Sequence, residues 1–130
     1  MRNNKLALCL VAVFGVLILS GPAFAHHGSA AYDMSKTVTV TGTVNDFQFI
    51  NPHVLLSMDV KDPSGKVEKW EGELTSPNRL TRAGWTKSTL KPGDQITIVG
   101  GPAKSGSTTM WIRKITKDGE DLDIGGGGDN

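Results

Sequence analysis

The sequence predicts an all-β fold, an OB-like β-barrel of five strands with one short helix between strands three and four. Three observations support this prediction. Five segments have strand-like patterns, helix signals occur only in residues 76–84, and the hydrophobic phase changes inside the first strand. An immunoglobulin-like sandwich fits less well, because it needs about seven strands and has no central helix.

The first strand is predicted to be long and bent. In "TVTVTGTV", residues 37–44, threonine alternates with valines at even positions, which is the period of a strand with one buried face. Phe47 and Phe49 stand at odd positions. A β-bulge near Asn45 and Asp46 would return both phenylalanines to the core face and bend the strand, as a small closed barrel requires.

The next two strands are predicted to form a hairpin. Apolar residues alternate in "HVLLSMDV", residues 53–60, which indicates a second strand beginning around His53. The four residues Asp62-Pro63-Ser64-Gly65 have the composition of a tight turn. The segment "KVEKWEGEL", residues 66–74, should therefore return antiparallel as strand three.

A short helix and two further strands complete the predicted barrel. In "SPNRLTRAG", Ser76 can cap a helix, Pro77 suits its first turn and Gly84 can end it. Trp85 is then expected to plug the bottom of the barrel. After the turn "LKPGD", strand four is "QITIVG", residues 95–100, and strand five is "TTMWIRKIT", residues 108–116.

The first 25 residues have the anatomy of a secretory signal peptide. Arg2 and Lys5 form a basic start, an apolar run follows, and Ala23-Phe24-Ala25 is a small-x-small cleavage site. We therefore expect a periplasmic or secreted protein without stable membrane insertion after cleavage, since nothing later is apolar enough to span a bilayer. The remaining expected segments are an N-terminal segment at 26–36, the barrel at 37–118 and a flexible Gly-rich tail at 119–130.

Composition narrows the chemistry of the mature chain. The sole cysteine, Cys9, lies inside the signal, so disulfides, thiolate ligands and cysteine nucleophiles are excluded after cleavage. Removing Arg2 and Lys5 from the 14 basic side chains leaves 12 against 13 acidic ones, a formal charge of −1 with histidine neutral. This balance argues against a nucleic-acid partner, because such binding depends on clustered lysine and arginine. An envelope protein stays a possible partner.

Four stretches together resemble a family of small exported bacterial proteins catalogued as a domain of unknown function. They are "AHHGSAAYD", "INPHVLLSMDV", "KWEGELTSPNRLTRAGW" and "LKPGDQITIVG". Members of that family show a His-His pair after the signal, Asn-Pro-His, Ser-Pro-Asn followed by Gly-Trp, and Lys-Pro-Gly-Asp. This chain departs from the pattern at Gly28, where serine is common, and at Leu74-Thr75, where smaller residues are usual. The resemblance implies export and a small β domain, and it implies no established activity.

The three histidines, His26, His27 and His53, are the candidate metal ligands. Cleavage after Ala25 would give His26 a free α-amine, whose ordinary pKa of about 7.7–8.0 leaves a neutral fraction near pH 7. That amine and the imidazole Nδ1 can chelate Cu(II), with His53 completing a T-shaped set. Copper is favoured because Cu(II) heads the divalent affinity order and accepts planar nitrogen sites. The pattern resembles the histidine brace of copper oxygenases and of some periplasmic copper carriers, without a shared fold.

Other metal arrangements stay open. Cleavage after Ala23 would leave Phe24-Ala25-His26, a free amine with histidine third, which also favours Cu(II). Zinc is the second choice, because it accepts three imidazoles and a carboxylate such as Glu71 or Glu73.

The histidines also have plain alternative explanations. His26 and His27 could form a flexible polar leader, and His53 could simply hydrogen-bond a backbone carbonyl. The tryptophans and methionines fit packing better than a ligand groove or a Cu(I) site, and the acidic residues Asp59, Glu71 and Glu73 fit a solvated face better than a hydrolytic pair. The residues set apart in this way are Trp70, Trp85, Trp111, Met34, Met58 and Met110.

Three functions follow from these observations. The leading hypothesis is a small exported barrel that binds copper for metal carriage or sensing at the cell envelope, without catalysis of its own. The second is a metal-free adaptor or ligand-binding module whose histidines are incidental. The third is a copper oxidase, which also needs an open coordination position and a substrate face, and no sequence feature indicates such a face.

Overall fold

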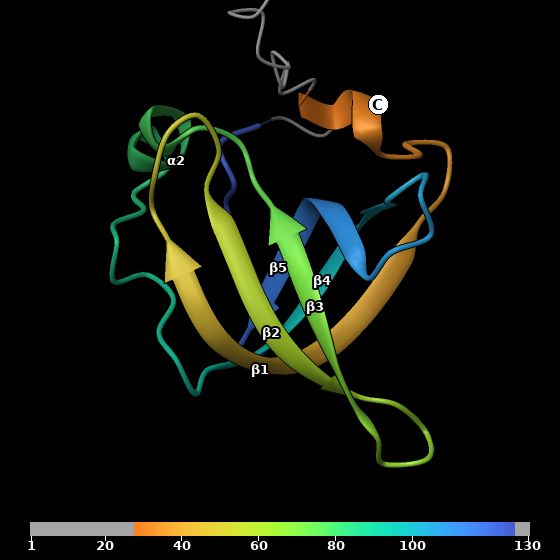
Figure 1. Ribbon diagram of the computed structural model, residues 1–130. Helices are drawn as coiled ribbons and strands as arrows, with labels where there is room; N and C mark the ends of the chain where they lie inside the picture. Colours follow the sequence, from red (N-terminus) through yellow and green to blue (C-terminus); the bar gives the residue numbers. More distant parts are fainter. Residues whose placement is uncertain (1–27, 127–130) are drawn as a thin grey trace, which may run out of the picture.

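The structure is a computed structural model and describes residues 28–126. The elements in chain order are the 3₁₀ turn η1 (Gly28–Ala31), β1 (Val38–Gln48), β2 (Leu55–Lys61), β3 (Val67–Glu73), α2 (Pro77–Arg82), β4 (Gln95–Pro102), β5 (Thr109–Lys117) and β6 (Glu120–Leu122). The strands curl around a common interior, α2 lies at one end, and the β2–β3 turn projects from the other end (Figure 1). No helix in the described part of the chain is long and apolar enough to cross a membrane.

The sheet closes on itself through its first five strands. The strand order is β3-β2-β1-β4-β5-β6, and β3 also pairs with β5. This extra pairing is parallel and covers Glu71 to Glu73 against Thr109 to Trp111, while the other ladders are antiparallel. With α2 between β3 and β4, this is the connectivity of the OB barrel, and the predicted fold class is confirmed.

The bulge in β1 lies where the change of hydrophobic phase predicts it. The register between β1 and β2 shifts between Val44 and Asp46, so Asn45 is the extra residue. Val44 is buried, and beyond the bulge Phe47 and Phe49 pack against the core. The extra residue therefore turns the second half of β1 by one position and keeps its aromatic side chains on the inner face.

Local sequence signals also place the hairpin and the helix. The Asp62 side chain accepts hydrogen bonds from the backbone N–H groups of Ser64 and Lys66, which closes the β2–β3 turn. Ser76 caps α2 by accepting a hydrogen bond from the N–H of Arg79, and Pro77 is the first helical residue. Both elements confirm the predictions from the sequence.

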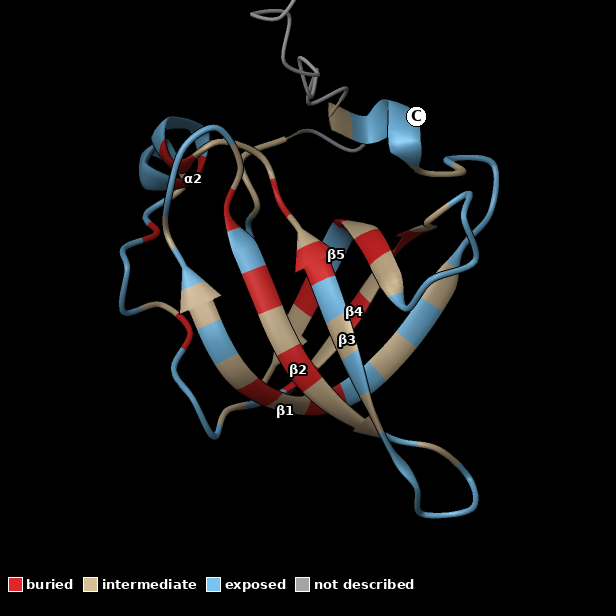
Figure 2. Ribbon diagram, viewed as in Figure 1, coloured by how far each residue is buried: buried red, intermediate tan, exposed pale blue. Residues whose placement is uncertain are grey.

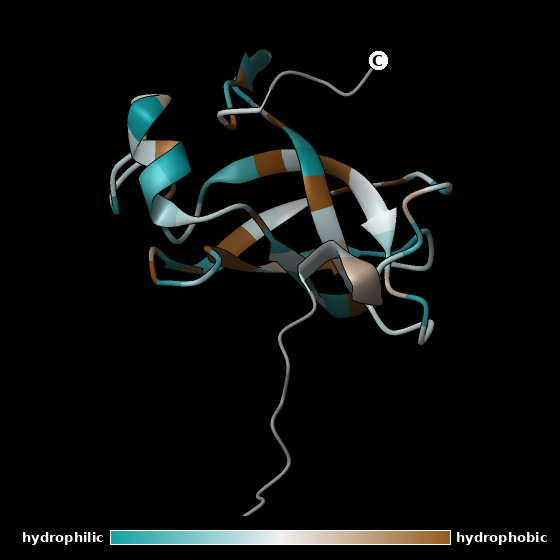
Figure 3. Cartoon of the chain, turned by 90° about the horizontal axis from the view of Figure 1, so that it is seen from above, coloured by the Kyte–Doolittle hydropathy of each residue, from teal (hydrophilic) through white to brown (hydrophobic). Residues whose placement is uncertain are grey.

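The core is one cluster of aliphatic side chains with Trp85 at its edge. Along β2 the buried residues Leu56 and Met58 alternate with residues that are exposed or of intermediate burial (Figure 2). The hydrophobic positions lie on the strands, while the turns and much of α2 are hydrophilic (Figure 3). Trp85 is only 4% exposed, its ring lies 6.0 Å from that of Phe47, and its indole N–H donates to the carbonyl of Asp123. Trp85 is therefore the predicted plug, and it also holds the C-terminal segment.

The C-terminal boundary differs from the expectation. The sequence predicts a flexible tail from residue 119, but Glu120–Leu122 form β6, which pairs with Lys117 to Ile115 of β5. Leu122 and Ile124 pack against the core, so this segment is part of the domain. The apolar character of Leu122 and Ile124 could have indicated that this segment is folded, but the glycine-rich composition around them obscured it. Residues 127–130 of the expected tail lie outside the described residues.

We predict that Trp85→Ala lowers the free energy of unfolding by about 3–5 kcal/mol, because it leaves a large cavity between Phe47 and the core. Urea unfolding followed by circular dichroism measures the change. The matched control is Val67→Ala, since Val67 is 49% exposed and should change stability by no more than about 0.5 kcal/mol. Equal effects of the two substitutions would show that Trp85 does not plug the core.

Candidate functional site

The segment before β1 is bound to the barrel over most of its length. We call residues 28–37 the N-terminal arm. Tyr32 forms an isolated antiparallel bridge with Ala103, the N–H of Asp33 donates to the carbonyl of Pro102 (2.8 Å), and the N–H of Lys104 donates to the carbonyl of Ala31 (3.0 Å). The arm therefore runs beside the end of β4 along a defined path.

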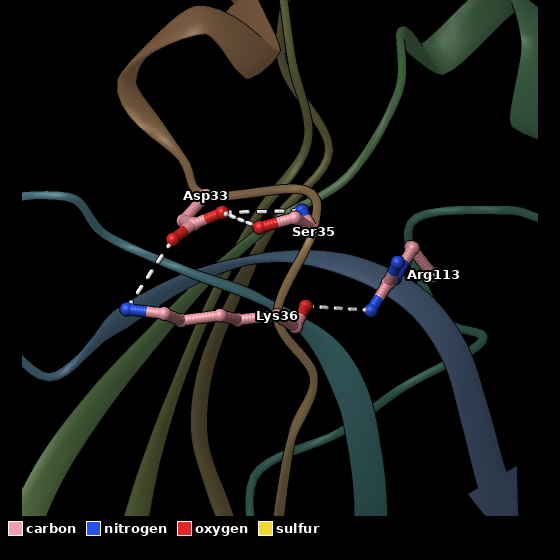
Figure 4. A network of polar contacts seen from close by, with 4 residues as sticks. All are labelled: Asp33, Ser35, Lys36 and Arg113. Carbon is pink, nitrogen blue, oxygen red and sulfur yellow. Dashed lines mark hydrogen bonds and ion pairs between the residues drawn. The ribbon is translucent and has the colours of Figure 1, made fainter.

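Side-chain contacts hold the second half of the arm (Figure 4). Arg113 of β5 donates to the carbonyl of Lys36 (2.9 Å) and to the hydroxyl of Thr37 (2.6 Å). Within the arm, Asp33 accepts hydrogen bonds from the hydroxyl and the backbone N–H of Ser35, and it forms an ion pair with Lys36 (3.4 Å). The hydrogen bonds from Ser35 hold the pKa of Asp33 below its ordinary value.

His53 lies two residues before β2, in the connection between β1 and β2. It follows the cis peptide bond between Asn51 and Pro52. Its Nδ1 contacts Oε1 of Glu73, the last residue of β3, and both side chains are about one-fifth exposed. The imidazole and the Trp111 ring of β5 form a T-shaped pair, with ring centroids 5.2 Å apart and planes at 89°. His53 is thus held on the outer surface of the barrel, over the seam where β3 meets β5.

Tyr32 completes this cluster from the N-terminal arm. Its hydroxyl donates to Oε2 of Glu73 at 2.7 Å, and its ring lies 6.1 Å from that of Trp111. Burial raises the pKa of Tyr32 strongly, and the hydrogen bond to Glu73 and the charges of Glu73 and Glu71 raise it further. Tyr32 therefore stays a neutral phenol at physiological pH and acts as a hydrogen-bond donor.

The Glu73 carboxylate selects one tautomer of His53. A carboxylate oxygen only accepts hydrogen bonds, so the contact with Nδ1 places a ring proton on that nitrogen. Nε2 has no hydrogen-bond partner within residues 28–126, and in the neutral ring it carries a lone pair. A histidine held by a carboxylate through one nitrogen, with the other nitrogen free, is the usual arrangement of a metal-ligating imidazole.

The start of the described chain lies beside this imidazole. A Cβ atom built on Gly28 would stand 3.6 Å from Cε1 of His53, the carbon between the two ring nitrogens. His26 and His27 themselves lie outside the described residues.

The other candidate ligands occupy different positions. Glu73 contacts His53 and Tyr32 through its two oxygens, while Glu71 is exposed on the same face of β3. Among residues 28–126, no three histidine, cysteine or acidic side chains come together in a way that could hold a metal ion. A metal site of three such ligands at His53 would therefore need a ligand from outside residues 28–126.

Sequence reasoning missed the roles of Tyr32 and Trp111. It set Trp111 aside as a core residue, but Trp111 points outward from the barrel and lies under Tyr32 and His53. The alternation along β5 could have indicated this outward direction, because Met110 and Ile112 on either side of Trp111 are buried. Tyr32 is the only tyrosine of the chain, and nothing in its local sequence indicates a partner 41 positions away.

Comparison with known proteins identifies the family and the fold. A family model described as "Family of unknown function (DUF6152)" matches residues 13–112. A search of curated proteins gave no significant match.

Two structures of the mitochondrial single-stranded DNA binding protein Rim1 from S. cerevisiae are each 8% identical, with a TM-score of 0.50. They cover 64% of this chain and 92% and 93% of their own chains. The small single-stranded DNA-binding protein from Streptomyces coelicolor is 16% identical, covers 64% of this chain and 94% of its own, and has a TM-score of 0.44. At such low identity, the yeast structures show a shared fold only.

We predict that Tyr32 ionises well above the ordinary tyrosine pKa of about 10. Because Tyr32 is the sole tyrosine, the ultraviolet absorbance of tyrosinate reports this one residue while circular dichroism confirms that the protein stays folded. Glu73→Gln should lower the midpoint, since it removes a neighbouring negative charge. A midpoint near 10 in the wild-type protein would contradict the contact between Tyr32 and Glu73.

The same shift predicts how alkali affects stability. The folded state keeps the Tyr32 proton, whereas the unfolded chain loses it above about pH 10, so the free energy of unfolding should fall as the pH rises above that value. This contribution is complete below about pH 10. In Tyr32→Phe the Tyr32 part of the pH dependence should be absent, which urea unfolding at several alkaline pH values would measure.

Proposed function

The chain belongs to the family of unknown function DUF6152, and from this premise we propose that it is an exported OB-like barrel that binds a transition metal, copper above others. The proposed ligands are His53 through Nε2 and the N-terminal histidines His26 and His27. Its role would be metal carriage or sensing at the cell envelope, without catalysis of its own.

The observation that carries this proposal is the state of the His53 imidazole. Glu73 holds Nδ1, Tyr32 holds the second oxygen of Glu73, and the Trp111 ring packs against the imidazole, so Nε2 is oriented and has no hydrogen-bond partner among residues 28–126. Such a supporting shell is found around metal-ligating histidines, where it sets the tautomer and raises the basicity of the coordinating nitrogen. A histidine that only ended a turn would not need a carboxylate partner that is itself held by a second residue.

The position of Gly28 supports the participation of the N-terminal histidines. Gly28 lies beside the ring of His53, and the arm that carries it is held by contacts at Tyr32, Asp33 and Arg113. His27 is the next residue along the chain, and His26 would carry the free amine if the signal is cleaved after Ala25. The two residues that the proposal adds to His53 therefore directly precede the described arm.

The donor set favours Cu(II). An α-amine and two or three imidazoles are nitrogen ligands, which suit a planar copper site, and Cu(II) forms the most stable complexes in the divalent series. Zinc would need a fourth ligand such as a carboxylate. Glu73 is engaged with His53 and Tyr32, which leaves the exposed Glu71 as the weaker zinc alternative.

We predict that the mature protein forms an equimolar Cu(II) complex that depends on His53. The protein is expressed with its native signal, the N-terminal mass is determined, and Cu(II) is titrated in competition with a chelator. His53→Ala should weaken the complex by more than about 100-fold, because a lost direct ligand costs more than the 10- to 100-fold typical of a lost supporting residue. Binding that is indifferent to His53, or absence of a tight complex, would overturn the proposal and leave the metal-free adaptor.

The role of the amine is tested separately. Protein carrying one extra residue before His26 should lose most of its Cu(II) affinity if the α-amine is a ligand. An unchanged affinity would show that only the imidazoles bind.

Addition of ascorbate and oxygen to the wild-type complex then separates a carrier from an oxidase, since only a redox-cycling site consumes the reductant catalytically.

We also predict that Glu73→Gln weakens Cu(II) binding by about 10- to 100-fold while keeping its stoichiometry, because the carboxylate orients His53 without touching the metal. Glu120→Gln on β6 is the matched control, since Glu120 is exposed and makes no contact with the site. A loss of stoichiometry in Glu73→Gln would instead identify Glu73 as a direct ligand. An affinity equal to that of Glu120→Gln would show that the carboxylate does not orient His53.

A further inference from the structure

The outer face of β1, β2 and β3 carries a recess that the proposed metal site does not use. Its volume is about 180 Å³, and it is lined by Tyr32, Asp46, Leu55, Ser57, Glu71 and Thr109, among others. We call it the outer-face recess. It adjoins the His53 site, because Tyr32 and Glu73 border both. In OB barrels this face, formed by the middle strands and the neighbouring loops, is where extended ligands bind.

Strand register arranges the recess in two parallel rows. In one row Asp46 of β1 pairs with Ser57 of β2, and Ser57 pairs with Glu71 of β3. Neighbouring strands are about 4.8 Å apart, so the Asp46 and Glu71 backbones flank Ser57 across roughly 10 Å. Two carboxylates therefore face each other across a small central residue.

In the second row one apolar residue, Leu55, forms the floor of the recess. Gln48 of β1 pairs with Leu55 of β2, and Leu55 pairs with Glu73 of β3. Leu55, the first residue of β2, is 40% exposed. Tyr32 and Thr109 border the recess on the side of β3, so the leucine lies in a hollow rather than on a flat surface.

The recess is acidic, and two of its carboxylates, Asp46 and Glu71, form no ion pair within the described residues. It is lined by three carboxylates, and no lysine or arginine is among its lining residues. Lys69, on the same face of β3, forms an ion pair with Asp59 (3.7 Å). The Glu71 carboxylate has no hydrogen bond or ion pair within the described residues, whereas Asp46 accepts one hydrogen bond, from Gln48 (2.7 Å). The local field therefore attracts a cation and repels phosphate.

We propose that the outer-face recess is a docking surface for an extended basic segment of a partner protein, with one arginine side chain in the recess. The aliphatic stem of arginine would lie on Leu55, and its guanidinium would reach the carboxylates of Asp46 and Glu71. Arginine fits better than lysine, because its planar fork pairs with carboxylates through two hydrogen bonds. This proposal does not rest on metal binding, since Asp46 and Glu71 are not among the proposed copper ligands.

The test uses metal-free mature protein and a short peptide with one central arginine, acetylated and amidated at its ends. Backbone amide shifts in NMR spectra are followed during titration. We expect saturable shifts at β1, β2 and β3, weakened by salt because the contact is partly exposed. The same peptide with citrulline, a neutral isostere of arginine, should bind at least about fivefold more weakly. Equal binding of the two peptides, or no saturation below about 10 mM, would overturn the proposal.

Variants locate the contact. Glu71→Gln and Asp46→Asn should each weaken arginine-peptide binding about two- to fivefold, which is the range for partly exposed ion pairs, and the double variant more. Glu120→Gln should bind like the wild-type protein. Thermal unfolding of each variant confirms that the fold is kept. Equal affinities for the double variant and Glu120→Gln, or saturable binding of a single-stranded oligonucleotide to this face, would refute a basic protein partner.

Discussion

The parallel pairing of β3 with β5 is the constraint on which the rest of the structure depends. It closes the barrel, and its register places Glu73 beside Trp111 and Gly72 beside Met110. On the inner side a side chain at position 72 would meet the Ile112 side chain, so Ile112 would have to move to make room for it. On the outer side the same pairing builds the base of the candidate site. The same three-residue ladder therefore closes the barrel and also positions the residues of the candidate site.

A single carboxylate then connects three distant parts of the chain. Glu73 contacts His53 from the β1–β2 connection and accepts a hydrogen bond from Tyr32 of the N-terminal arm. Because Trp111 packs beneath both partners, the cluster is partly shielded from water, which strengthens its hydrogen bonds and raises the pKa of Tyr32. The arm is consequently held where its first described residue, Gly28, lies beside the histidine.

The proposed metal site and the outer-face recess adjoin one another and differ in their chemistry. The first presents an imidazole nitrogen oriented by the Glu73 carboxylate. The second presents carboxylates around an exposed leucine. Both lie where an OB barrel ordinarily meets its ligands, yet the charge of this surface differs from the basic surface that phosphate recognition requires. Fold and ligand chemistry are separate properties, because the fold depends on buried positions and the ligand on exposed ones.

Local patterns were sufficient to predict most of the fold. The bulge at Asn45, the cap at Ser76 and the plug at Trp85 all follow from neighbouring residues, since hydrophobic phase, capping and turn chemistry act over a few positions. Strand β6 was missed because glycine-rich surroundings masked two apolar residues. The sequence by itself identified His53 as a candidate metal ligand. It did not identify the partners of His53, because those contacts span 20 residues to Glu73 and 58 residues to Trp111. Only closure of the barrel brings those side chains together, and no periodicity along the chain encodes that pairing.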